Sequence, residues 1–90
     1  MHRIDIIVTG QVQGVWFRRY TQEKARELGI TGWVRNESDG TVTIVAEGND
    51  KLLIKLIKWL EIGSPDSNVD TLKLNWGESQ EELNSFEVIK

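Results

Sequence analysis

A chain of 90 residues, 39% of them hydrophobic and 28% charged, has the composition of a soluble globular protein and the length of one domain, spanning residues 1–90. Its net charge of −3 argues against a general nucleic-acid binder, and we expect a cytoplasmic protein, because no apolar run reaches the ~18 residues of a membrane span and Asp5 stands where a signal peptide would be apolar. The absence of cysteine excludes disulfides, thiolate metal sites and cysteine nucleophiles, and the single histidine, His2, excludes a His-based triad or a multi-histidine metal site.

The first half of the chain predicts three strands and one helix. Alternating isoleucine and valine residues over 4–8 predict the first strand. A helix over about residues 17–28 follows, with apolar residues at helical spacing, and Gly29 ends it. Residues 30–36 and 41–47 form two further strands. The Asp-Gly pair in the turn between them predicts a hairpin, so these strands are antiparallel neighbours.

The second half predicts a helix and two strands. Asn49 or Asp50 caps a second helix that carries a continuous apolar stripe. Residues 69–76 alternate as a fourth strand, and residues 85–89 form a short fifth. The polar and acidic stretch 77–84 is the loop between them.

This order of elements, βαββαβ with an extra short C-terminal strand, predicts the α+β class and a ferredoxin-like sandwich. Two right-handed crossovers on one antiparallel sheet place both helices on the same face. The first and third strands are then central, with the second strand beside the third. This architecture hosts many functions, so the fold alone does not indicate an activity.

The segment GQVQGVWFR, residues 10–18, joins the first strand to the first helix. A helix start leaves about four backbone N–H groups without partners, and residues 11–18 contain none of the Ser, Thr, Asp or Asn residues that usually cap them. Gly14 lets the backbone turn so that the amides of residues 13–18 converge on an external anion, and Arg18 adds a planar charged fork suited to phosphate or carboxylate oxygens. The loop predicts an anion site, although glycine-containing loops are also common structural connections. Neither a Walker A nor a dinucleotide-binding motif is present, so nucleotide binding is not indicated.

Asn36 ends the second predicted strand, where the hairpin turns. Asparagine is favoured in turns because it hydrogen-bonds its own backbone, so this position alone fits a purely structural role. In the predicted strand order, however, the end of the second strand lies near the loop that leaves the first. An amide there is able to donate and accept hydrogen bonds beside the anion site.

Two segments resemble the signatures of the acylphosphatase family. GQVQGVWFR at 10–18 resembles the first, and GWVRN at 32–36, followed by GTV at 40–42 and Gly48, resembles the second at the right spacing. The resemblance continues through three further segments, GND at 48–50, WL at 59–60 and GSP at 63–65. It therefore covers nearly the whole chain, with no departure at a position expected to be functional.

The resemblance implies an enzyme, an acylphosphatase, that hydrolyses small acyl phosphates to a carboxylate and inorganic phosphate without a metal or cofactor. It implies that Arg18 clamps the phosphate and that Asn36 orients a water for in-line attack on phosphorus. The expected substrate-binding residues are Gln13, Gly14, Val15, Trp16, Phe17 and Arg18. Such a division suits phosphoryl transfer, which depends on positioning and charge stabilisation more than on covalent chemistry. We expect a monomer with no nucleic-acid or membrane partner.

Two further expectations concern residues near Arg18 in the sequence. Arg19 should point elsewhere on the helix, so that its alanine variant is nearly silent. Trp16 lies inside the loop and is a candidate to cover the acyl end of the substrate.

Two other classes of protein stay open. A ferredoxin-like binding module would keep the phosphate loop without catalysis and would have no use for Asn36. An RNA-binding domain of this architecture would need a basic, aromatic sheet face, and strands 3–9 and 41–47 carry no aromatic residue.

Overall fold

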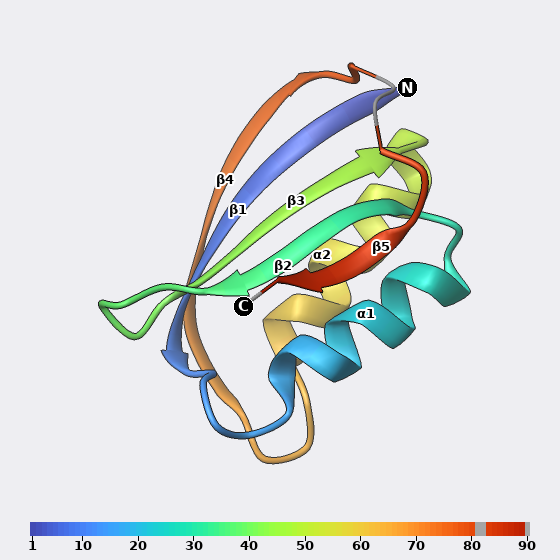
Figure 1. Cartoon of the computed structure of the whole chain (residues 1–90). Helices are drawn as coiled ribbons and strands as arrows, with labels where there is room; N and C mark the ends of the chain where they lie inside the picture. The colour runs from blue at the N-terminus through green and yellow to red at the C-terminus, as the bar shows by residue number, and fades with distance from the viewer. Residues whose placement is uncertain (81–82, 90) are drawn as a thin grey trace.

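Two helices cover one face of a five-stranded sheet in the computed structural model, which describes residues 1–80 and 83–89 (Figure 1). The elements in chain order are β1 (His2–Gln11), α1 (Phe17–Glu27), β2 (Thr31–Asn36), β3 (Val42–Gly48), α2 (Asp50–Ile62), β4 (Asn68–Glu78) and β5 (Phe86–Ile89). The predicted ferredoxin-like sandwich with an extra C-terminal strand is therefore confirmed. Neither helix in the described part of the chain is long and apolar enough to cross a membrane.

The strand order across the sheet is β4-β1-β3-β2-β5. Four strands pair antiparallel as predicted, β1 with β3 and β4, and β2 with β3. β5 departs from the predicted all-antiparallel sheet, because it pairs parallel with β2 and makes the sheet mixed. β4 and β5 lie at opposite edges of the sheet, and the chain runs in opposite directions in these two strands (Figure 1). β4 and β2 run in opposite directions, so the reversed chain enters β5 parallel to β2.

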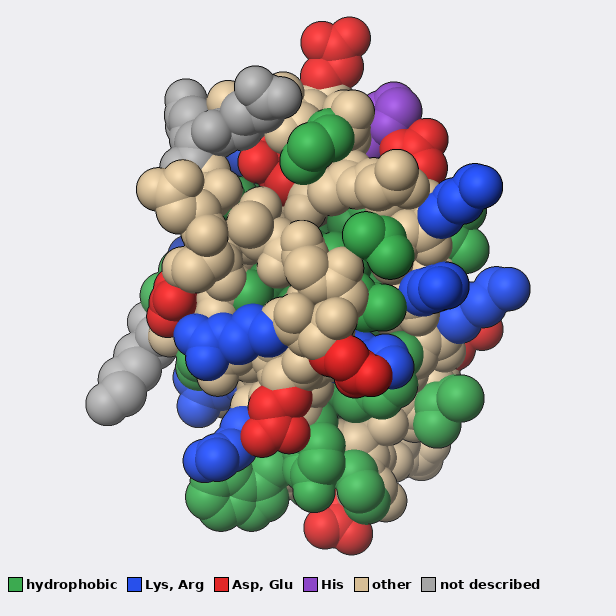
Figure 2. Space-filling model, turned by 90° about the vertical axis from the view of Figure 1, so that its right-hand side faces the viewer, with side chains coloured by type: hydrophobic (Ala, Val, Ile, Leu, Met, Phe, Trp, Pro, Cys, Tyr) green, Lys and Arg blue, Asp and Glu red, His purple; other side chains and the backbone are tan. Residues whose placement is uncertain are grey.

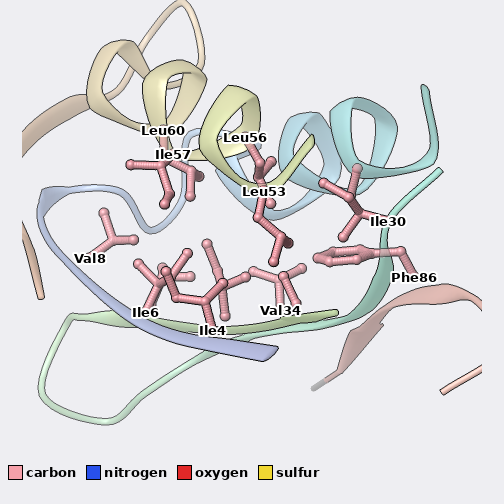
Figure 3. Close-up of a cluster of buried hydrophobic side chains, with 14 of the residues drawn as sticks. Ile4, Ile6, Val8, Ile30, Val34, Leu53, Leu56, Ile57, Leu60 and Phe86 are labelled. Atoms are coloured by element: carbon pink, nitrogen blue, oxygen red, sulfur yellow. The ribbon is translucent and has the colours of Figure 1, made fainter. Parts of the chain in front are cut away.

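The core lies between the sheet and the helices. Alternation in β1 and β3 turns one apolar set toward the helices, and these side chains are fully buried: Ile4, Ile6, Val8, Val42, Ile44 and Ala46. The helical repeat of α2 lays its apolar stripe over them, and Figure 3 shows Leu53, Leu56, Ile57 and Leu60 reaching from that helix toward β1. Burying this apolar surface is the main source of stability, at roughly 25 cal/mol per Å².

The element ends follow local chemistry. Asn49, one of the two predicted caps, begins α2, and its side chain accepts a hydrogen bond from the Lys51 backbone N–H at 2.9 Å. Gly29 follows α1 with a φ of 74°, a left-handed conformation that glycine adopts without steric cost. β4 is longer than predicted and takes Gly77 and Glu78 from the predicted loop. Residues 81 and 82 of that loop lie outside the described residues.

Charged side chains of both signs are interspersed over the face that Figure 2 shows. Neighbours form exposed or half-buried ion pairs, including Arg3 with Asp5 at 3.0 Å and Arg26 with Glu87 at 3.5 Å. Such pairs contribute about 0–1 kcal/mol each to stability. These surface charges therefore contribute more to the protein's solubility and to its association with other molecules than to the stability of its fold.

Candidate active site

The loop between β1 and α1 has an unusual backbone. Gly14 has a φ of 74°, and Trp16 has a φ of 62° and is the one non-glycine residue at positive φ in the described part of the chain. A bulky side chain in this left-handed region costs on the order of 1–3 kcal/mol, and such residues cluster at functional sites. Left-handed residues that alternate with ordinary ones turn successive N–H groups to one side of the backbone and form an anion-binding concavity.

The N–H groups of this loop have no acceptor within the described chain. α1 has no side-chain cap at Trp16 and no acidic residue in its first turn. Among residues 1–80 and 83–89, no hydrogen bond uses a backbone N–H of residues 12–16 as donor. The N–H groups of the first helical turn also lack intrahelical partners, and the positive end of the helix dipole lies at the same point. This arrangement can bind an anion.

Contacts with two other loops fix the shape of this concavity. The Gln13 Nε2 donates to the backbone carbonyls of Glu37 at 2.7 Å and Thr41 at 2.9 Å, which ties the loop to the β2–β3 hairpin. The Ser64 hydroxyl donates a long hydrogen bond of 3.4 Å to the Val15 carbonyl. The side chain of Gln13 and the carbonyl of Val15 therefore hold the loop in place, and what these two residues can offer a ligand is their amides.

Phe17 anchors the helix end of the loop. Its ring is 1% exposed and packs against Trp59, with ring centroids 6.2 Å apart. Because this ring is buried, what Phe17 can offer a ligand is its backbone N–H.

A cavity of about 400 Å³ opens over the loop. Five predicted residues line it, namely Gly14, Trp16, Phe17, Arg18 and Asn36. Val12, Arg19 and Val88 line it too, and the sequence pattern did not indicate them. Arg18 and Asn36, which are eighteen positions apart in sequence, thus border one cavity. Arg19, which the sequence predicts to point elsewhere on the helix, also lines this cavity, and its Nε lies 3.4 Å from the Glu23 carboxylate.

Arg18 is held by the C-terminal strand. Its Nη1 donates to the backbone carbonyl of Ile89 at 3.2 Å. A guanidinium has five N–H donors, so this contact orients the fork and leaves the other donors for a ligand. The carbonyl lies within reach because β5 pairs with β2 and packs beside α1.

The Asn36 side chain presents an unpaired oxygen. Its Oδ1 is buried and has no hydrogen-bond partner among the described residues. Leaving a buried acceptor unpaired costs about 1–3 kcal/mol of folding free energy. A buried polar group without a partner is often one that has a catalytic role or binds a water. The turn itself depends on Asp39, whose carboxylate accepts from the Thr41 backbone N–H at 3.0 Å and from its hydroxyl at 2.7 Å. Asn36 therefore does not have the turn-forming role that its position allows.

The other charges near Asn36 are paired with one another. Arg35 lies over the Trp33 ring at 4.9 Å and donates to Glu37 at 2.9 Å. Hydrogen bonds from the Thr43 hydroxyl and from Arg35 hold the pKa of the Glu37 carboxyl below its ordinary value, so this group stays ionised at neutral pH. Of the residues that the structure describes, the cationic ones that border the cavity itself are Arg18 and Arg19. No group of three or more metal-ligating His, Cys, Asp or Glu side chains lies together in the described part of the chain.

Fold and site together define an α+β sandwich protein with an uncapped helix start, an arginine held by the C-terminal strand and an asparagine that borders the same cavity. Within this class, the acylphosphatase family model matches residues 4–88, and the chain belongs to the acylphosphatase family. The resemblance of its two sequence segments to that family is thus confirmed.

Relatives and solved structures agree over the full length. The chain is 47% identical over 88 residues to the acylphosphatase of Shewanella amazonensis, covering 98% of this chain and 97% of the relative. The crystal structure of acylphosphatase from Bacillus subtilis matches it with a TM-score of 0.97 and 37% identity over 100% of both chains. An acylphosphatase structure from Coxiella burnetii matches with a TM-score of 0.90 and 38% identity, over 97% of this chain and 90% of that one. The sandwich and its C-terminal strand are thus shared with solved members of the family.

Proposed function

We propose that this protein is a metal-independent hydrolase that cleaves the carboxyl-phosphate bond of small acyl phosphates. Membership of the acylphosphatase family supports this activity. The observation that carries the mechanism is that Arg18 and Asn36 border one cavity over an uncapped loop. The binding-module alternative accounts for the loop and for Arg18 but gives no role to Asn36.

The phosphate group binds to the loop amides of residues 13–18 and to Arg18. Free N–H groups at a helix start, together with the helix dipole, attract an anion, and the guanidinium fork matches two phosphate oxygens. The same N–H donors stabilise the negative charge on the phosphoryl oxygens in a loose transition state. Because these donors are already in place, no reorganisation is needed at the moment of reaction.

Asn36 positions the attacking water. Its side-chain amide, which borders the cavity, hydrogen-bonds a water and holds a lone pair of that water toward phosphorus. The water oxygen bonds to phosphorus as the bond from phosphorus to the acyl oxygen breaks. The acyl phosphate dianion and water give a carboxylate and dihydrogen phosphate, so both water protons end on the phosphate. A carboxylate is a good leaving group, so the reaction does not require a general acid.

The protein acts as a single domain over residues 1–90, as a monomer in the cytoplasm, without nucleic-acid or membrane partners. The net charge of −3 supports this part of the proposal, as does the mixture of acidic and basic side chains on the face in Figure 2.

The test is hydrolysis of benzoyl phosphate by the purified protein in the presence of a strong metal chelator. Turnover that persists with chelator supports a metal-independent hydrolase. A folded protein that binds inorganic phosphate but does not turn over benzoyl phosphate would instead be the binding module.

A further inference from the structure

The side chain of Gln13 joins the two parts of the candidate active site, the loop that follows β1 and the hairpin that carries Asn36. β1 and β2 are not neighbours in the sheet, because β3 lies between them. Adjacent strands lie about 4.8 Å apart, so β1 and β2 are separated by roughly 10 Å. A side chain that spans this separation determines how the loop and Asn36 are placed relative to each other.

The Gln13 amide nitrogen meets two backbone carbonyls of the hairpin. Its Nε2 lies 2.7 Å from the carbonyl oxygen of Glu37 and 2.9 Å from that of Thr41. A side-chain amide nitrogen has two N–H donors, so one glutamine can satisfy both acceptors at once. Among the described residues, every hydrogen bond between residues 12–16 and this hairpin comes from this one side chain.

The two carbonyls lie at the neck of the hairpin, directly beside Asn36. The Glu37 backbone N–H donates to the Thr41 carbonyl at 2.9 Å and closes the turn. Asn36 precedes Glu37 and pairs with Val42 as the last pair of the β2–β3 ladder. A shift of this neck relative to the loop therefore moves Asn36 relative to an anion bound in the loop.

The groups that bind the anion are held by other contacts. Arg18 donates to the carbonyl of Ile89, and the carbonyl of Val15 accepts from the hydroxyl of Ser64. Neither contact involves the Gln13 side chain. Loss of the Gln13 bridge should therefore leave the anion donors largely in place and displace chiefly the hairpin.

We propose that Gln13 is a positioning residue for acyl phosphate hydrolysis, whose side-chain amide fixes the distance between Asn36 and the phosphate in the loop. This inference rests on the proposed function, in which Asn36 holds the attacking water. Gln13 acts on turnover through Asn36 and not on the affinity for phosphate. A misplacement of about 1 Å in such a site can lower the rate by on the order of 10².

The first test is Gln13→Met, which keeps a side chain of similar length but has no N–H donor. We expect kcat for benzoyl phosphate to fall by roughly 10- to 100-fold, while the inhibition constant of inorganic phosphate stays within about twofold of the parent value. Gln22→Met is the matched control, because Gln22 is also a half-buried glutamine whose Nε2 donates to a backbone carbonyl, that of Phe86 at 3.1 Å. Its kcat should stay within about twofold of the parent value, since the contact lies between α1 and β5 and does not reach the hairpin.

The second test is a double-mutant cycle with Asn36→Ala, which separates positioning from a general loss of stability. Once Asn36 is alanine, no side chain is left for Gln13 to position, so adding Gln13→Met should lower kcat by less than about twofold. Slow variants are measured in single turnover with the enzyme in excess. Gln13→Ala is a second variant that lacks the same donors, and thermal unfolding shows which variants are folded at the assay temperature.

The outcomes separate the inference from the proposed function. If the parent protein does not hydrolyse benzoyl phosphate, the proposed function is wrong, and the role of Gln13 loses its basis with it. If the parent protein is active, the inference is overturned when folded Gln13→Met keeps kcat within about twofold, or loses the same factor with and without Asn36. Loss of phosphate inhibition in Gln13→Met would make Gln13 a phosphate-binding residue, and failure of both Gln13 variants to fold would make it a residue required for folding. Either result would also overturn the inference.

Discussion

The two helices of this protein begin in opposite ways. α2 starts at Asn49, whose backbone is extended and whose side chain accepts from the Lys51 N–H, and it has the acidic Asp50 in its first turn. α1 starts at Trp16, which is left-handed, has no side-chain cap and precedes a first turn without an acid. Both helices face the same problem of about four unpaired N–H groups. A side chain of the chain itself accepts from one of these groups in α2, whereas α1 has no side-chain cap.

This difference separates stability from function. The N-terminus of α2 has an acceptor in Asn49 and a negative charge in Asp50, so we expect that end of the helix to gain little from a bound anion. The N-terminus of α1 has no side-chain cap and includes the left-handed Trp16, so we expect an anion to stabilise this end. Ligand-induced stabilisation should therefore arise at one helix start and not at the other.

The largest effect is expected when the uncapped start of α1 loses the positive charge of Arg18. Arg18→Ala should reduce acyl phosphate turnover by on the order of 10³–10⁵, as is typical for a phosphate-clamping arginine. Steady-state hydrolysis of benzoyl phosphate measures this loss. Arg18→Lys should recover little of it, because an ammonium group does not reproduce the planar fork.

Arg18 also contacts the carbonyl of Ile89, so its variants need a stability control. Phosphate at 100 times its Kd should stabilise the parent protein by about 2.7 kcal/mol, and thermal unfolding with and without phosphate should show this stabilisation lost in Arg18→Ala. Near-normal turnover in a folded Arg18→Ala variant would refute the assignment of the clamp.

The second-largest effect is expected at Asn36, which borders the cavity at the uncapped start of α1. Asn36→Ala should lower kcat by on the order of 10²–10³, because the attacking water is no longer oriented. Inorganic phosphate should still inhibit with an affinity close to that of the parent protein, since the loop and Arg18 are unchanged. A collapse of phosphate inhibition in this variant would make Asn36 a binding residue instead.

A smaller effect is expected at the closed helix start. Asn49→Ala removes the cap of α2 and should lower the free energy of unfolding by about 1 kcal/mol. Denaturant unfolding measures this change. Turnover and phosphate-induced stabilisation should match the parent values, and a change in either would contradict the separation of the two helix starts.

The smallest effect is expected in the hairpin turn that receives the Gln13 side chain. Hydrogen bonds from the Thr41 side chain, and then from its backbone N–H, lower the pKa of the Asp39 carboxyl in the folded protein. Its stabilising contribution is therefore fully present above the unfolded pKa of about 4 and is lost as pH falls through the lower folded value. Asp39→Asn keeps the acceptor oxygen but removes the charge. Its melting temperature should lie slightly below that of the parent at pH 7 and converge with it toward pH 2, whereas a constant difference would exclude this linkage.

Local sequence patterns predicted most of the fold. Alternation and helical spacing report which residues share a face, because side-chain direction repeats with a fixed period in each element. The Asp-Gly turn and the Asn49 cap were predictable since each acts on neighbouring backbone groups. The position of β5 was not, because four residues carry too little pattern to specify a partner strand.

The candidate site, like the fold, has features that local sequence predicts and features that depend on the tertiary structure. The lack of a capping residue between positions 11 and 18 is a property of the sequence, and it predicts the uncapped start of α1. That Arg19 borders the cavity depends on the direction in which α1 leaves the loop. The contribution of Val88 depends on the pairing of β5 with β2.

The sequence by itself determined the elements, the hairpin, the open helix start and the family, since each depends on residues close together in the chain or on matching motifs. Only the tertiary structure decided which carbonyl orients Arg18, that the Asn36 oxygen is buried without a partner among the described residues, and that the Gln13 side chain reaches the β2–β3 hairpin. These features require segments far apart in sequence to meet. Burial across the whole sheet decides such contacts, and no local pattern encodes it.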